Sequence, residues 1–332
     1  MGKTGGTTGS NQYQVRGTAK RSDSITPTPP QHLLHQADTS APRPTMASHF
    51  GNLGARSPEQ VADLMGETVV LSRYCKSARE AHLQSLVGMV GIGGKVPMPD
   101  GTTFTVTEGS PSQSFDQEAI WSHISQDAAD SPDPEQRVLA TARGMLNKQP
   151  WSTTGIRDVL NQDPDRFCTA TYGDLVAVPS ETGYVSAEGL GLYETEIVPL
   201  TQSQPNAVST AQAVIKLDAK QAELRAYQVA MSEHLVAHGN IGRGEQLVGA
   251  NGTVVELHRQ VNRTGWNHDA VWDSLKRLPN VEADSSAERA QGQVERIRQL
   301  VGKARWSVRA LDREKLDEAH HQVDGKVGYR LS

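Results

Sequence analysis

The strongest constraint on the fold of this chain is an internal repeat. An Asp-Gly dipeptide, Asp100-Gly101, stands before a β-branched run, and an Asn-Gly dipeptide, Asn251-Gly252, has the same surroundings later in the chain. A tryptophan follows each dipeptide at the same distance. The two glycines are 151 positions apart (252 − 101), and so are Trp121 and Trp272 (272 − 121). A constant separation of this length indicates two copies of one module.

Further matches extend the repeat in both directions. The landmarks occur in the same order in each copy: Leu71–Tyr74 with Leu224–Tyr227, His82-Leu83 with His234-Leu235, Trp151-Ser152 with Trp306-Ser307, and Gly173–Val176 with Gly325–Gly328. About 60–178 therefore matches 216–332, with small shifts in spacing. We predict a mostly helical α+β fold with two tandem modules, each in the order helix, β-hairpin, helix, helix, strand.

The predicted domain organisation has four parts: a disordered basic tail at 1–57, a first module at 58–178, a linker at 179–215 and a second module at 216–332. The tail is rich in Gly, Ser, Thr, Pro and Gln. Such a composition buries too little apolar surface to offset the entropy of ordering the chain. The linker has no hydrophobic periodicity, and the segment 193–197 is its one candidate for a short edge strand.

Local signals place the predicted helices and hairpins. Ser57-Pro58 is typical of a helix start, because serine caps the first turn and proline fits the first helical position. Ser114 with Gln117 three residues later predicts a capping box for the next helix. The Asp-Gly and Asn-Gly dipeptides are strong signals of two-residue hairpin turns. An isolated hairpin is marginal in water, so each is expected to pack on the helices beside it.

The composition excludes several classes of protein. A formal net charge of −5 and a pI of about 6.1 give no overall attraction to nucleic acid or to anionic membranes. The sequence has no apolar run long enough to span a bilayer and no secretion signal, so we expect a cytoplasmic protein without a membrane partner. Cys75 and Cys168 do not occupy matched positions, so no shared cysteine metal site is expected. No cofactor and no catalytic residue are predicted.

Tryptophan and histidine supply the first candidate sites. Trp121, Trp151, Trp272 and Trp306 stand at equivalent places in the two copies. They are interpreted as core anchors, with a stacking platform for bases as the alternative. The histidine candidates are His82, His234 with His238, His268 beside Asp269, and His320-His321 near Glu318. Only His82 and His234 are matched between the copies, and we interpret all of these histidines as structural or solvent-facing rather than as metal ligands.

The densest basic stretch lies near the end of the chain. It contains Arg296, Arg298, Lys303, Arg305 and Arg309. On one helix face, these side chains would contact phosphate groups. The alternative is a solvated surface that nearby acidic residues partly neutralise. The first module has no equivalent cluster.

Two short motifs resemble a known group of proteins. The run 261–269 places a Thr-Gly-Trp-x-His-Asp turn before a helix, and Trp151 precedes a segment with Asp163, Asp165, Phe167 and Cys168. Both patterns resemble uncharacterised proteins of actinobacterial phages and mobile elements. The resemblance implies an accessory factor, and it assigns no ligand and no catalytic residue.

Three functional hypotheses follow. The leading one is a non-enzymatic binding or adaptor protein of a phage or mobile element that assists nucleic-acid transactions through the basic stretch. The second is a structural or assembly protein with two similar protein-binding modules. The third is an enzyme that uses His234 with His238 or His268 with Asp269. Nucleic acid and protein are therefore the two partner classes left open, and the oligomeric state is not predicted.

Overall fold

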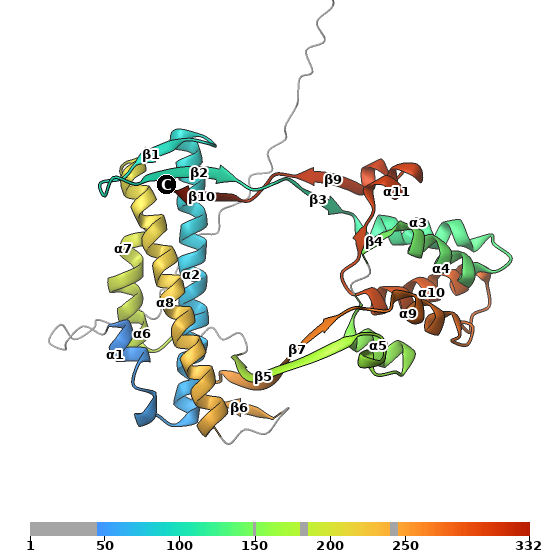
Figure 1. The fold of residues 1–332 in the computed structure, drawn as a ribbon, viewed down its shortest axis with the longest axis horizontal. Helices are drawn as coiled ribbons and strands as arrows, with labels where there is room; N and C mark the ends of the chain where they lie inside the picture. Colours follow the sequence, from blue (N-terminus) through green and yellow to red (C-terminus); the bar gives the residue numbers. More distant parts are fainter. Residues whose placement is uncertain (1–44, 149–150, 180–184, 240–244) are drawn as a thin grey trace, which may run out of the picture. The chain divides into compact units, whose positions relative to one another are not determined.

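A computed structural model describes residues 45–148, 151–179, 185–239 and 245–332, all of them within the unit Pro42–Ser332 (Figure 1). The fold is α+β and mostly helical, as expected. Most of the predicted tail, residues 1–44, lies outside the described residues. Among the described helices, none combines the length and the apolar character that crossing a lipid bilayer requires.

The two longest helices form an antiparallel pair. Helix α2 spans Pro58–Val90, and α8 spans Ala207–His238 (Figure 1). Leu83 and Leu86, near the end of α2, share a core with Ala211 and Val214, near the start of α8. The predicted cap of α2 is confirmed, because the Ser57 side chain accepts from the backbone of Gln60 in a capping box. Helix α8 begins nine residues before the predicted start at 216 (216 − 207).

Both predicted hairpins are present, but the two-residue turn predicted for each is wrong, because the loops have three residues, 99–101 and 250–252. Strand β1 (Lys95–Pro97) pairs with β2 (Thr103–Glu108), and β6 (Gln246–Val248) pairs with β7 (Val254–Thr264). Gly101 and Gly252 both have a φ of 85°, in the left-handed region that glycine adopts without steric cost. The backbone conformation therefore explains why a glycine stands at both positions.

The remaining strands pair across the two halves of the chain. Strand β5 (Thr169–Pro179), which includes the predicted closing strand of the first module, pairs with β7 of the second. Strand β10 (Val327–Leu331) pairs with β2, and β9 (His320–Val323) pairs with β3 (Ser112–Phe115). Strand β4 (Leu146–Lys148) pairs with β8 (Arg305–Trp306). The predicted module boundaries stay a prediction, but each of these ladders joins 58–178 to 216–332.

Six helices surround a core that contains four tryptophans, named here the tryptophan core. They are α3 (Gln117–Ala129), α4 (Pro134–Met145), α5 (Thr153–Leu160), α9 (His268–Lys276), α10 (Ser286–Val301) and α11 (Val308–Arg313). Trp121 packs edge to face on Trp306 at a centroid distance of 4.7 Å, and Trp151 packs likewise on Trp272 at 5.3 Å. All four are buried, which confirms their interpretation as core anchors.

Polar contacts in this core also occur as matched pairs between the two halves. Trp306 Nε1 donates to Gln117 at 2.8 Å, and Trp151 Nε1 donates to His268 Nδ1 at 2.8 Å. Backbone hydrogen bonds form two such pairs: Asp116 N to Ala319 O matches Asn267 N to Phe167 O, and Ser307 N to Met145 O matches Ser152 N to Leu300 O. Ion pairs form a third: Arg298 with Glu118 matches Arg143 with Asp269. Each contact has a counterpart in which the two halves exchange roles.

The expectations for the tail, for the linker and for one helix cap are wrong. Residues 45–57 belong to the folded part: helix α1 (Met46–Phe50) buries Met46 and Phe50 in the core between α2 and α8. The linker has no edge strand at 193–197 but a π-helical turn, Tyr193–Ile197, between α6 (Ala187–Leu192) and α7 (Val198–Thr201). Helices this short contain too few apolar residues to reveal a period. The third error is the cap at Ser114, which lies in β3, so that Asp116 caps α3 instead.

Candidate protein-binding groove and the predicted site residues

A groove of about 1,100 Å³ lies between α8 and β5 and is named here the α8–β5 groove. Its lining comes from α2 (Met65, Val69), from β5 (174–179), from α8 (Arg225, Gln228, Val229, Ser232, Glu233, Val236) and from β7 (Arg259, Gln260). The α8 residues recur every three or four positions, so they share one face of that helix.

The other wall of the groove is the edge of a sheet. Strand β5 is an outer strand in the order β5-β7-β6. Six consecutive β5 residues line the groove, although alternate residues of a strand point to opposite faces. The groove therefore runs along β5, and Arg259 and Gln260 of the neighbouring strand β7 also line it. A hydrogen bond from Ala177 N to Ser232 Oγ, at 2.7 Å, ties this edge to α8.

Apolar side chains are unusually exposed in the α8–β5 groove. The exposed fraction is 58% for Val229, 45% for Val178 and 38% for Val236. Side chains this exposed do not enclose a small molecule. A cluster of them on one surface is typical of a protein-binding site.

Four charged side chains accompany the exposed valines. Arg225 and Glu233 lie on α8, eight residues or roughly 12 Å apart along the helix axis. Arg259 and Asp174 lie on the strands opposite. In the part of the chain that the structure describes, none of the four forms a side-chain ion pair or hydrogen bond. The groove thus offers charges of both signs to a partner.

The predicted basic helix at 296–313 is wrong as a single element. Arg296 and Arg298 lie on α10, which ends at Val301, whereas Arg305 lies on β8 and Arg309 on α11. Arg298 pairs with Glu118, and Arg296 donates to the carbonyl of Pro279 at 2.9 Å. Lys303, Arg305 and Arg309 are exposed, and no carboxylate within the described ranges pairs with them. The five residues therefore do not form one helical face.

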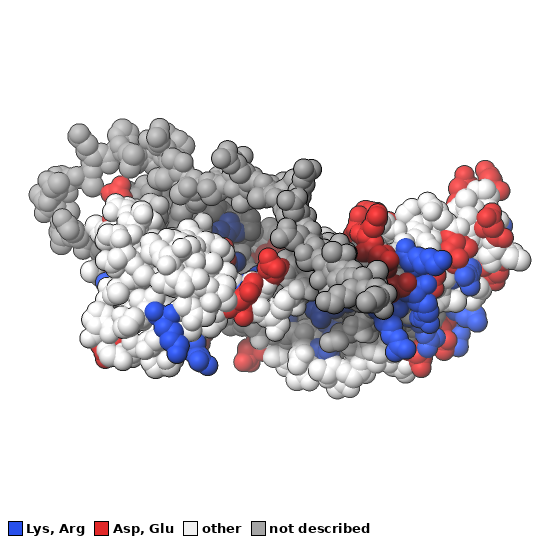
Figure 2. Space-filling view, turned by 90° about the horizontal axis from the view of Figure 1, so that it is seen from above, with Lys and Arg blue, Asp and Glu red and all other residues white. Residues whose placement is uncertain are grey.

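The surface charge is also mixed. On the face that Figure 2 shows, Lys and Arg side chains lie among Asp and Glu side chains rather than in a continuous field of one sign. A surface that attracts phosphate groups strongly is usually dominated by basic residues.

The predicted histidine candidates lie in separate places. His82 is buried, and its Nε2 lies 2.6 Å from the carbonyl oxygen of Leu200. The rings of His234 and His238 contact each other at 4.8 Å on α8. His268 accepts a hydrogen bond from Trp151. His82 and His268 therefore have structural partners, which agrees with the interpretation given to them.

Both cysteines are free thiols. Burial raises the pKa of the Cys75 thiol to about 11. Burial is also the main cause that raises the pKa of Cys168. Because the thiolate is the nucleophile, neither environment favours cysteine chemistry at neutral pH.

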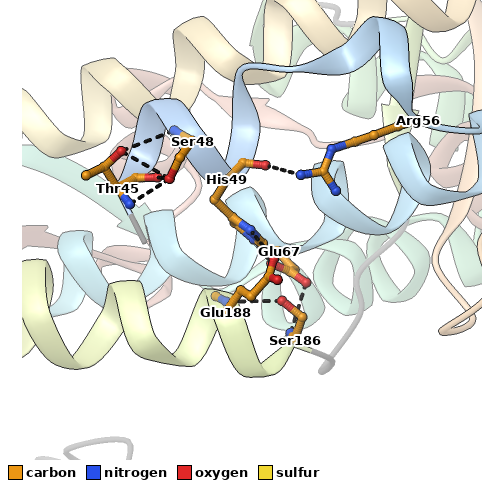
Figure 3. Close-up of polar contacts among 8 residues, drawn as sticks. Thr45, Ser48, His49, Arg56, Glu67, Ser186 and Glu188 are labelled. Atoms are coloured by element: carbon orange, nitrogen blue, oxygen red, sulfur yellow. Dashed lines mark hydrogen bonds and ion pairs between the residues drawn. The ribbon is translucent and has the colours of Figure 1, made fainter. Parts of the chain in front are cut away.

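A buried acid–histidine cluster was missed at the sequence level (Figure 3). His49 of α1 places Nε2 2.8 Å from Glu67 of α2, and its Nδ1 3.1 Å from Glu188 of α6. The other carboxylate oxygen of Glu67 accepts from the backbone N–H of Ser186 at 2.9 Å. Because His49 and Glu67 are 3% and 1% exposed, the cluster fastens three helices together. The signal was hidden because His49 fell in the predicted tail.

Comparison of the chain with protein-family models, with curated proteins and with solved structures found no match.

Proposed function

We propose that the chain is a duplicated module whose two copies have exchanged strands and core contacts, and that it works as a non-enzymatic protein-binding adaptor. The observation that supports the duplication is the matched set of contacts around the tryptophans. Trp121 of the first half packs on Trp306 of the second, and Trp272 of the second half packs on Trp151 of the first. The two pairs are equivalent in the repeat, with the two halves interchanged. A two-fold relation between the halves accounts for both pairs at once.

The observation that supports protein binding is the α8–β5 groove. Its exposed valines provide apolar contact area, and its four charged side chains form no side-chain ion pair or hydrogen bond with the residues that the structure describes. This chemistry fits a peptide segment with two or three apolar side chains and a charged residue of each sign beside them. Partly apolar surfaces of this kind bind through a few central anchors.

The groove can be tested with a library of displayed random peptides. Selection on the full-length chain is expected to enrich peptides with an apolar centre and flanking charges. Val229→Asp and Val178→Asp should each weaken the binding of enriched peptides at least tenfold, because a charge then lies in the apolar centre. Since both valines are exposed, the thermal melt of each variant should change little.

Val323→Asp is the matched control. Val323 is 41% exposed, but it lies on β9 and does not line the groove. Equal binding by the groove variants and the control would contradict the proposal. Enriched peptides without apolar residues would contradict it as well.

Nucleic-acid binding is the second candidate function. The exposed side chains of Lys303, Arg305 and Arg309 support it, since phosphate contacts come from such basic residues. Anisotropy of labelled DNA and RNA at about 50 and 200 mM salt tests this role. Neutralising Arg298, Arg305 and Arg309 together should weaken salt-sensitive binding, and unchanged binding would end this assignment. A role in a phage or mobile element stays a prediction under either function.

A further inference from the structure

Two aspartates and a histidine meet at the turn that leads from α11 into β9. Asp312 lies on the last turn of α11, Asp317 lies in the 3-10 turn Asp317–Ala319, and His320 begins β9. One ligand atom from each side chain lies within 4.8 Å of the other two. His320 Nε2 is 2.9 Å from Asp312 Oδ1. Three possible donor atoms therefore lie close together.

The backbone of this turn is fixed at both ends. Leu311 and Ala319 are buried in the tryptophan core. Backbone bonds connect Leu316 N to Leu311 O at 3.0 Å and Asp116 N to Ala319 O at 2.7 Å. Lys315 adopts a φ of 58°, which reverses the chain between the two aspartates. A turn held in this way presents its side chains with little loss of entropy on binding.

The charges in the cluster are not balanced by other described side chains. Asp312 and Asp317 are both exposed, and within the described residues neither forms an ion pair with lysine or arginine. The fold thus holds two carboxylates close together, with a histidine as the neighbouring group. A divalent cation would neutralise both carboxylates.

We propose that Asp312, Asp317 and His320 bind one divalent transition-metal ion, with Zn²⁺ as the best match. One imidazole nitrogen and two carboxylate oxygens are ligands that zinc accepts, at bond lengths of about 2.0–2.2 Å. Donors on one zinc ion lie roughly 3–4 Å apart, so small rotations of the exposed carboxylates complete the contact. The bound ion fixes the end of α11 to the start of β9, where β9 pairs with β3.

The test is calorimetric titration of Zn²⁺ into the full-length chain after treatment with a chelator. One ion per chain is expected. Asp317→Asn is the most informative variant, because Asp317 has no side-chain hydrogen bond among the described residues and the change keeps its shape. It should weaken Zn²⁺ binding at least about tenfold, while the melt of the metal-free protein stays unchanged. His320→Ala should weaken binding similarly.

Two controls make the result decisive. His321→Ala should bind like the unmodified chain, because adjacent strand residues point to opposite faces. His238→Ala tests the histidine pair on α8 and should also bind normally. The proposal is overturned by an absence of binding below about 1 mM Zn²⁺, by full binding in Asp317→Asn, or by loss of binding in His238→Ala.

Discussion

At the scale of single residues, the clearest consequence concerns His49. Its ring lies between the buried carboxylate of Glu67 and the exposed carboxylate of Glu188. Removing His49 leaves the buried carboxyl group of Glu67 without one of its hydrogen-bond partners, and a buried polar group left unsatisfied typically costs about 1–3 kcal/mol. His49→Ala should lower the free energy of unfolding by an amount in this range, as measured by urea denaturation.

Glu188→Gln provides the comparison for His49→Ala. Glu188 lies on the exposed side of the same ring, with a side chain that is 71% exposed. Ion pairs at exposed positions contribute about 1 kcal/mol or less, so this change should have a small effect. If His49→Ala left the denaturation midpoint unchanged, the N-terminal helix would not be fastened to α2 as described.

Single residues predicted local structure reliably where that structure strongly favours one residue type. The left-handed φ of Gly101 and Gly252 made the hairpin turns predictable, and Ser57 made the start of α2 predictable. His49 gave no such signal. Its role depends on Glu67 and Glu188, which are 18 and 139 positions away. A buried pair between distant residues has no local pattern in one sequence.

At the scale of helices and strands, the long helices and the two hairpins were predictable, but the strand partners were not. The apolar run in 175–178 indicated a strand, and the strand exists as part of β5. Its pairing with β7 depends on the position of β7 in the folded chain. Local strand propensity carries no information about that position. The polar strands β3 and β9 were missed, because His320–Val323 and Ser112–Phe115 lack the apolar alternation that marks a half-buried strand.

The crossed tryptophan pairs give a prediction at this scale. Trp121→Ala and Trp306→Ala should each destabilise the protein by about 3–5 kcal/mol, because each removes a buried aromatic ring. A double-mutant cycle between them should show a coupling of about 0.5–3 kcal/mol, as expected for residues in contact. Denaturant melts of the four proteins supply the measurement.

A second cycle controls for general effects on stability. Trp121 and Phe104 belong to different cores, so their effects should add to within about 0.5 kcal/mol. Additivity for Trp121 with Trp306 as well would show that these rings do not stabilise each other.

At the scale of the whole molecule, the contacts join the two segments of the chain that match each other in the sequence repeat. Four strand ladders and the matched tryptophan contacts all connect 58–178 to 216–332. The proposed duplication rests on two dipeptide turns and four tryptophans that stand at matched spacings in the sequence. The proposed exchange could not be inferred from the sequence, since two modules that fold separately and two that exchange strands have the same repeat. The α8–β5 groove depends on the pairing of β5 with β7, because β5 forms one wall of it.

Disulfide trapping tests the proposed exchange most directly. In a background with Cys75→Ala and Cys168→Ser, cysteines are placed at 113 and 322 across β3 and β9, or at 171 and 262 across β5 and β7. Directly opposed residues in antiparallel strands have Cα atoms about 4.5–5.5 Å apart, within the range that a disulfide spans. A control pair at 113 and 262 joins strands that do not pair with each other.

We predict that both register pairs oxidise to disulfides within one chain and that the control pair stays reduced. Register pairs that remain reduced, or that form disulfides only between chains, would contradict the exchange.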